Sequence, residues 1–176
     1  MENFVMIELL RKRRSIRAYT DRPIKPEHMD LLQEALLRSP TSRNLRPWRF
    51  IFIENTDLLE KLSRCKPHGA SFLAGARLGI VILGDETISD VWVEDCAIAS
   101  ILAQLTAQSL GLGSCWIQIR KRMYDGNQSA EQYIQSLLDL PEHLRVESII
   151  ALGYPAETKT GIAHESLDRS RIGVKR

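Results

Sequence analysis

The chain has few cysteines, few aromatic residues and almost no net charge. Its 176 residues include three cysteines and 6% aromatic residues, and the formal net charge is +2. Cys65, Cys96 and Cys115 are odd in number and lack CxxC spacing, which argues against a disulfide framework and favours buried thiols in a reducing compartment. Because the protein is not broadly basic, a general nucleic-acid-binding surface is not expected.

Long hydrophobic runs and the signatures of common hydrolases are also absent. No stretch approaches ~20 uninterrupted apolar residues, so we expect no membrane-spanning helix and no membrane partner. The amino terminus reaches a basic cluster after a short apolar run, so we expect no signal peptide and take the cytoplasm as the default location. The four histidines are scattered without an HExxH pair, and no GxSxG occurs, so we expect neither a metal site nor a serine hydrolase.

Apolar periodicity predicts one domain over residues 1–176, in which helices and strands alternate without a linker or repeat. Hydrophobic residues make up 44% of the chain, which is enough for a substantial core. We expect helices that start near Val5 and Pro26, a long helix over 90–110, and another after the capping box of Ser129 and Gln132. Strands are expected over 48–53, 78–83, 114–119 and 146–154, the first two buried on both faces.

Two segments lack the pattern of an ordinary surface element. The helix over 90–110 is apolar on nearly every side, so it needs cover from the centre of the fold or from a second subunit. The carboxyl-terminal tail, residues 155–176, has too few apolar residues for a core of its own. It is therefore expected either to be disordered or to lie across another surface.

A cluster of arginines follows the first helix. Arg13, Arg14 and Arg17 surround Ser15, and three guanidiniums with a hydroxyl between them suit a phosphate group. If the helix continued past Ser15, the arginines would have to outweigh the adverse dipole at its carboxyl end. The alternative interpretation is a solvated basic helix end.

A polar loop precedes the first strand. Pro40 and Pro47 fix its two ends, while Thr41, Ser42 and Asn44 present hydroxyl and amide groups between them. Such a loop suits polar contact with a ligand. The alternative is an ordinary polar turn.

The two glycines of Gly111-Leu112-Gly113 do not form a dinucleotide-binding loop. A Rossmann fingerprint follows a strand, opens a helix and has a third glycine. Here the pattern follows a helix, opens a strand and has Trp116 at the third position. Any nicotinamide substrate is therefore expected to stack transiently in the substrate site.

Five segments in a consistent order, with consistent spacing, resemble the nitroreductase family of FMN-dependent oxidoreductases. They are the arginine cluster, the polar loop, and residues 92–97, 111–118 and 151–157. Small bacterial members with Trp-Ile-Gln-Ile-Arg after the glycines look most similar. The resemblance implies an α+β fold, a mainly antiparallel central sheet flanked by helices, and an intertwined homodimer with two FMN sites at the subunit interface.

The resemblance also implies a role for each candidate site residue. The FMN phosphate, ribityl chain and pyrimidine edge would contact Arg13, Arg14, Ser15 and Arg17. The second subunit would approach the flavin with Pro40, Thr41, Ser42 and Asn44. The isoalloxazine would lie along Trp116, Ile117 and Gln118, with the backbone N–H of Gln118 directed at flavin N5. Lys159 would supplement the phosphate site, although a lysine in a polar tail is usually solvated.

The implied activity is hydride transfer from NADH or NADPH to FMN, followed by reduction of an electron-poor acceptor such as a nitroaromatic or a quinone. The flavin carries this chemistry, so no side-chain acid or base is required. The alternatives are a specialised reductase of an unsaturated or halogenated metabolite, and a flavin-binding or flavin-sensing protein without efficient turnover. Two departures bear on the acceptor more than on the cofactor: Arg46 stands where the family commonly has Gln, and Leu102 where many members have Asn.

Overall fold

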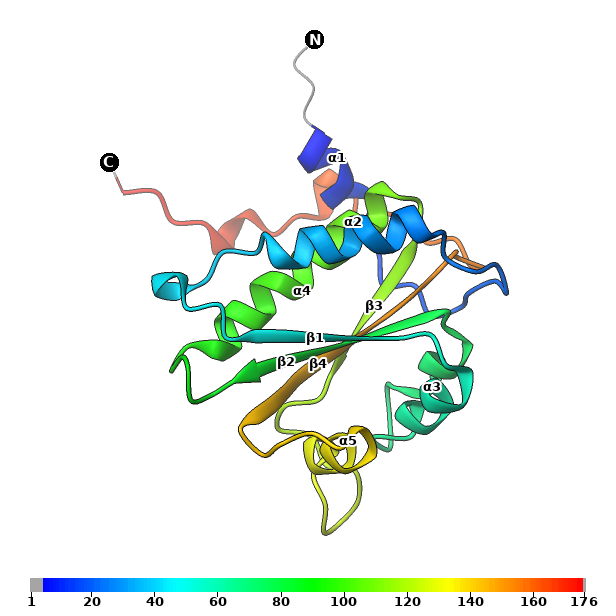
Figure 1. Cartoon of the computed structure of the whole chain (residues 1–176). Helices are drawn as coiled ribbons and strands as arrows, with labels where there is room; N and C mark the ends of the chain where they lie inside the picture. Colours follow the sequence, from blue (N-terminus) through cyan, green and yellow to red (C-terminus); the bar gives the residue numbers. More distant parts are fainter. Residues whose placement is uncertain (1–4, 176) are drawn as a thin grey trace.

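A computed structural model describes residues 5–175 and shows an α+β fold around one antiparallel sheet (Figure 1). The order of the strands across the sheet is β1-β2-β4-β3, and every neighbouring pair is antiparallel. The strands are β1 (Trp48–Ile53), β2 (Leu78–Asp85), β3 (Gly113–Gln118) and β4 (Leu144–Gly153). The predicted fold class and the four predicted strands are confirmed, and the bounds of the strands agree to within two residues.

Five α-helices and several short 3₁₀ turns lie around this sheet in the described part of the chain. The helices are α1 (Val5–Lys12), α2 (Pro26–Leu37), α3 (Thr56–Ser63), α4 (Trp92–Ser109) and α5 (Ala130–Leu138). One core lies between the sheet and the α2–α4 layer, and a second lies on the other face under α3 and α5 (Figure 1). The sheet is therefore covered on both faces.

Local sequence signals explain where several helices begin and end. Pro26 is the first residue of α2, where its missing N–H costs nothing, and Leu32 and Leu36 of that helix are buried. Ser129 and Gln132 form the predicted capping box before α5. Gly111 follows α4 with a φ of 72°, a left-handed conformation that suits glycine and ends the helix.

Two features differ from the sequence-based expectations. Helix α3 was not predicted, although Asn55 caps it by accepting a hydrogen bond from the N–H of Leu58 at 2.8 Å. Strand β1 is not buried on both faces, because it lies at one edge of the sheet and leaves Arg49 exposed. Strand β2 is buried along its whole length, since it lies between β1 and β4.

Apolar side chains remain exposed on α1, on α4 and along the tail. Helix α1 has no buried residue, although Val5, Met6, Ile7 and Leu10 are apolar. The sheet covers only part of α4, whose Ile98 and Ile101 stay exposed, as do several apolar residues of the tail. No helix of the described residues is long and apolar enough to cross a membrane.

The three cysteines are buried, as expected, and none forms a disulfide. Within residues 5–175, no group of three or more His, Cys, Asp or Glu side chains is arranged to hold a metal ion.

Candidate functional site

The arginine segment, residues 13–17, has left the helix before it reaches Ser15. Helix α1 ends at Lys12, and Ser15 then pairs in parallel with Ser114 at the free edge of β3. The N–H of Ile16 donates to the carbonyl of Ser114 at 3.0 Å. The arginines therefore belong to an extended segment beside the sheet. They do not lie on a helix end whose adverse dipole they would have to outweigh.

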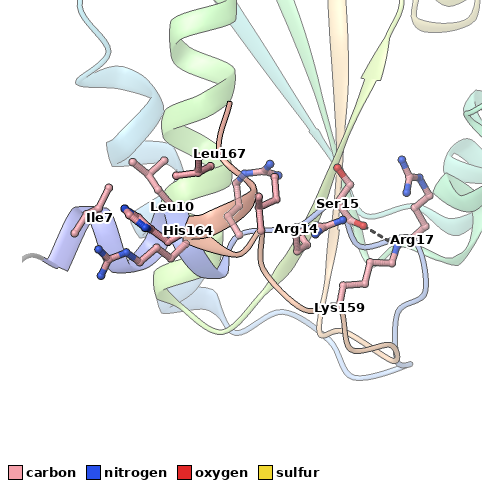
Figure 2. A pocket seen from close by; sticks show the side chains of 11 residues that line it. Ile7, Leu10, Arg14, Ser15, Arg17, Lys159, His164 and Leu167 are labelled. Atoms are coloured by element: carbon pink, nitrogen blue, oxygen red, sulfur yellow. Dashed lines mark hydrogen bonds between the residues drawn. The ribbon is translucent and has the colours of Figure 1, made fainter. Parts of the chain in front are cut away.

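The arginine segment lines a cavity of about 900 Å³, hereafter the arginine cavity (Figure 2). Its lining combines basic and hydroxyl groups with apolar side chains from α1 and the tail. These residues are Arg11, Arg13, Arg14, Ser15, Arg17, Lys159, His164, Ile7, Leu10, Ile162 and Leu167. No carboxylate occurs among these lining residues. The cavity therefore suits a ligand that carries an anionic group and an apolar body.

The tail closes this cavity through specific contacts. Lys159 Nζ donates to the carbonyl of Ser15 at 2.8 Å and pairs with Glu157 at 3.0 Å. Glu157 in turn accepts the N–H of Arg17 at 2.5 Å, and this bond, with help from Lys159, holds the pKa of its carboxyl below the usual value. Arg14 donates to the carbonyl of Thr160 at 2.7 Å. Lys159 is therefore part of the cavity wall and not merely a solvated lysine.

Tyr19 also holds the arginine segment in place. The Tyr19 hydroxyl donates to the carbonyl of Ile16 at 2.6 Å, and burial raises the pKa of this phenol far above its usual value. A Cβ placed on Gly153 would lie within 3.1 Å of the Tyr19 ring, so glycine permits this close packing. The segment is thus held on β3 and β4 independently of any ligand.

The free edge of β3 offers backbone groups beside the arginine segment. The carbonyl of Ser114 accepts from Ile16, and that of Gln118 accepts from Lys66 Nζ at 2.8 Å, so both residues direct their backbone groups away from β4. Because N–H and C=O of one strand residue point the same way, the N–H of Gln118 also faces the free edge. Ile117, which precedes Gln118, pairs with Ile149 and has its backbone groups in the opposite orientation, toward β4. Its side chain is fully buried.

Lys66 contacts the edge of β3 beside the candidate site, and the sequence did not predict this contact. Its side chain joins the segment after α3 to the edge of β3, and burial lowers its pKa. A single lysine between Cys65 and Pro67 gives no motif, so the contact to Gln118 appears only once the chain is folded.

The polar loop, residues 40–47, lies beside the amino-terminal end of α4, whereas the arginine segment lies beyond the carboxyl-terminal end of that helix (Figure 1). The N–H of Ser42 donates to Asp95 near the start of α4, whereas the arginine segment pairs with Ser114, beyond the end of that helix. Asp95 and Ser109 are separated along α4 by about 21 Å, at 1.5 Å per residue. One protomer therefore does not bring together the two sets of predicted ligand-binding residues.

Comparisons with known proteins identify the family to which the chain is similar. The model of the nitroreductase family matches residues 10–66 and 64–154. An FMN-dependent nitroreductase from Clostridium difficile R20291 has a similar structure over 97% of this chain and 99% of its own, with 43% identity and a TM-score of 0.95.

Two relatives with curated names are similar in sequence. One from Methanothermobacter thermautotrophicus, provisionally named an NADH dehydrogenase/NAD(P)H nitroreductase, is 37% identical over 155 residues, 86% of this chain and 78% of its own. An NAD(P)H-dependent FMN reductase from Bacillus subtilis is 28% identical over 173 residues, 86% of this chain and 66% of its own. Because the matched region spans the arginine segment, the polar loop and all four strands, the protein belongs to the nitroreductase family.

Proposed function

We propose that the protein is an FMN-dependent oxidoreductase that uses NADH or NADPH, with the FMN phosphate in the arginine cavity. The observation that carries this proposal is the chemistry of that cavity: several cations, a hydroxyl and apolar surface, with no carboxylate in the lining. A flavin mononucleotide has a dianionic phosphate at one end and an apolar ring system at the other. The residues present therefore fit this cofactor.

In this proposal each part of the site has a separate task. Arg13, Arg14 and Arg17 neutralise the phosphate together with Lys159, and Ser15 adds a short-range donor beside them. With FMN bound, Trp116 and Gln118 would border the isoalloxazine at the edge of β3, and the N–H of Gln118 would be directed at its N5. When bound, FMN accepts hydride and passes electrons on, so the side chains need only bind and orient.

We further propose that the protein is a homodimer with two shared flavin sites, one domain of residues 1–176 in each chain. The exposed apolar surface of α1, α4 and the tail suits burial against a second copy. The polar loop is too far from the arginine cavity to reach the same flavin within one chain. In a dimer, Pro40, Thr41, Ser42 and Asn44 instead approach the flavin of the partner subunit.

The turnover that fits this site is a ping-pong cycle. No separate nicotinamide-binding fold occurs in the described chain, so NAD(P)H and the acceptor take turns over one flavin face, and the acceptor is of the nitroaromatic or quinone type. Three buried, unpaired thiols suit a reducing compartment such as the cytoplasm. The alternatives are a specialised reductase of an unsaturated or halogenated metabolite, and a flavin sensor.

Two measurements test the proposed function. The purified protein should be yellow, and the flavin released on denaturation should be FMN and not FAD. Steady-state oxidation of NADH or NADPH with an added quinone should continue over many turnovers and give parallel reciprocal plots. A sensor would be reduced once and stop, and a colourless protein that cannot be reconstituted with FMN would overturn the proposal.

A further inference from the structure

The polar loop has an unusual backbone that other contacts must hold in place. Arg43, Asn44 and Arg46 have φ values of 52°, 55° and 51°, in the left-handed region that residues with a Cβ rarely adopt. Three such residues within four positions persist only where the surroundings fix them. The loop therefore adopts a backbone conformation that its own residues do not favour.

A buried carboxylate makes the contact between this loop and the helical layer. Asp95, in the first turn of α4, is only 2% exposed, and its Oδ1 accepts the N–H of Ser42 at 2.9 Å. Its second oxygen, Oδ2, is buried without a hydrogen-bond partner in the described residues. A buried carboxylate with one free oxygen is costly, so it is a poor choice for packing alone. The amino-terminal end of α4 favours its negative charge.

The N–H of Asp85 donates to the carbonyl of Pro47 at 2.8 Å, where the loop joins β1, and the remaining contacts of the loop are local or exposed. Thr41 Oγ1 accepts the N–H of Arg46 at 3.0 Å, which closes the loop on itself without attaching it to the fold. Arg43 pairs with Asp90, but these side chains are 63% and 79% exposed, and solvent weakens such a pair. The bond from Ser42 to Asp95 is thus the buried attachment of the loop to α4.

We propose that Asp95 is a positioning residue for the flavin site: through the N–H of Ser42 it holds the polar loop in the shape that presents Thr41, Ser42 and Asn44. It acts through the loop and touches neither the flavin nor the substrate. The part of this inference that concerns flavin rests on the proposed function, whereas the hold on the loop does not.

The first test measures the loop in the protein without flavin. Amide hydrogen exchange is followed at Asn44, Leu45 and Arg46 in the wild type and in Asp95→Ala, Asp95→Asn and Asp90→Asn. Exchange should accelerate by about tenfold in Asp95→Ala, the factor that corresponds to loss of one charge-assisted bond. Asp95→Asn keeps an oxygen acceptor and should partly restore protection. Asp90→Asn, which removes only the exposed pair, should change exchange little.

The second test asks whether Asp95 acts through Ser42. Ser42→Pro deletes the N–H that Asp95 accepts, while Ser42→Ala removes only the hydroxyl. Proline fits here because Ser42 opens a 3₁₀ turn and Thr41 before it has a ψ of 154°. FMN affinity should fall by about tenfold in Asp95→Ala, and Asp95→Ala should add nothing further in the Ser42→Pro background.

The outcomes separate the two proposals. Wild-type loop exchange in both Asp95 variants, or an Asp95 effect on FMN affinity that adds in full to that of Ser42→Pro, would overturn the role of Asp95. If Asp95→Ala does not fold, Asp95→Asn in the same two measurements decides the question, with a smaller expected effect. A wild-type protein that binds no FMN would overturn the proposed function, while the exchange experiment would still test the hold of Asp95 on the loop.

Discussion

The arginine segment and the polar loop are both held by contacts within the chain, but the chain builds a cavity around the first and attaches the second at the opposite end of α4. The arginine segment meets β3, Tyr19 and the tail, which together form a cavity around it. The polar loop is fixed by Asp95 at the other end of α4, away from that cavity. In the dimer that we propose, each chain carries the phosphate half of one site and the loop half of the other.

The largest effect should come from the phosphate half. Replacing Arg14 and Arg17 together by Ala should weaken FMN binding by about 3–6 kcal/mol, at about 1.5–3 kcal/mol for each charge-assisted contact. Titration of apoprotein with FMN measures this, and Arg38→Ala at the exposed carboxyl-terminal end of α2 is the matched control. Unchanged affinity in the double variant would place the phosphate elsewhere.

Breaking the dimer should remove the loop half while leaving the phosphate half intact. Ile98 and Ile101 are 41% and 37% exposed on α4. Changing both to Glu should cost at least about 3 kcal/mol of dimer stability, because apolar burial is lost and charges would be desolvated. Sedimentation measures the mass, with Ile88→Glu as a control outside α4. A double variant that stays dimeric would show that this face of α4 is not part of the interface.

The sequence predicted the fold better than the site. The strands were found because their apolar runs reflect burial, and α5 because the capping box of Ser129 and Gln132 is a local signal. Helix α3 was missed because its single Asn55 cap resembles a turn. Lys66 and Asp95 contact partners 52 and 53 residues away, and such pairings become visible only in the fold. Lys159 was predicted from the resemblance, but its place in the cavity wall depends on a tail that the family match does not reach.

The sheet contains a buried titratable group, and its effect on stability can be measured separately from the arginine segment and the polar loop. Glu147 on β4 is 3% exposed with Oε2 unpartnered, and burial raises its pKa from 4.5 to about 7, against smaller opposing effects of Ser148 and Arg120. Since the folded state binds this proton more tightly, the stabilising contribution is complete below pH 4.5 and is lost as the pH rises through about 7.

Glu147→Gln cannot ionise and should therefore escape this loss. Between pH 4.5 and pH 8 the wild type should lose about 3 kcal/mol of unfolding free energy relative to Glu147→Gln. Urea unfolding at the two pH values measures the difference. An equal difference between the two proteins at both pH values would show that Glu147 does not titrate in this range.

The smallest effect concerns the edge of β3, where the two halves would meet over the flavin. Gln118→Pro removes an N–H that faces away from β4, so the sheet should tolerate it. Flavin reduction should slow by about tenfold, as expected for the loss of one hydrogen bond worth about 1.4 kcal/mol. Anaerobic stopped-flow bleaching reads this step, and Gln118→Ala, which keeps the N–H, should remain close to wild type. Wild-type bleaching in a folded Gln118→Pro protein would contradict the assignment.

The central claim is that each flavin site is assembled from two chains. Sedimentation velocity at micromolar protein, followed at the visible absorbance of the flavin, tests it most directly. The flavin signal should sediment only with a dimer that carries two FMN, while any monomer should be colourless. A stable monomer that carries FMN would contradict it.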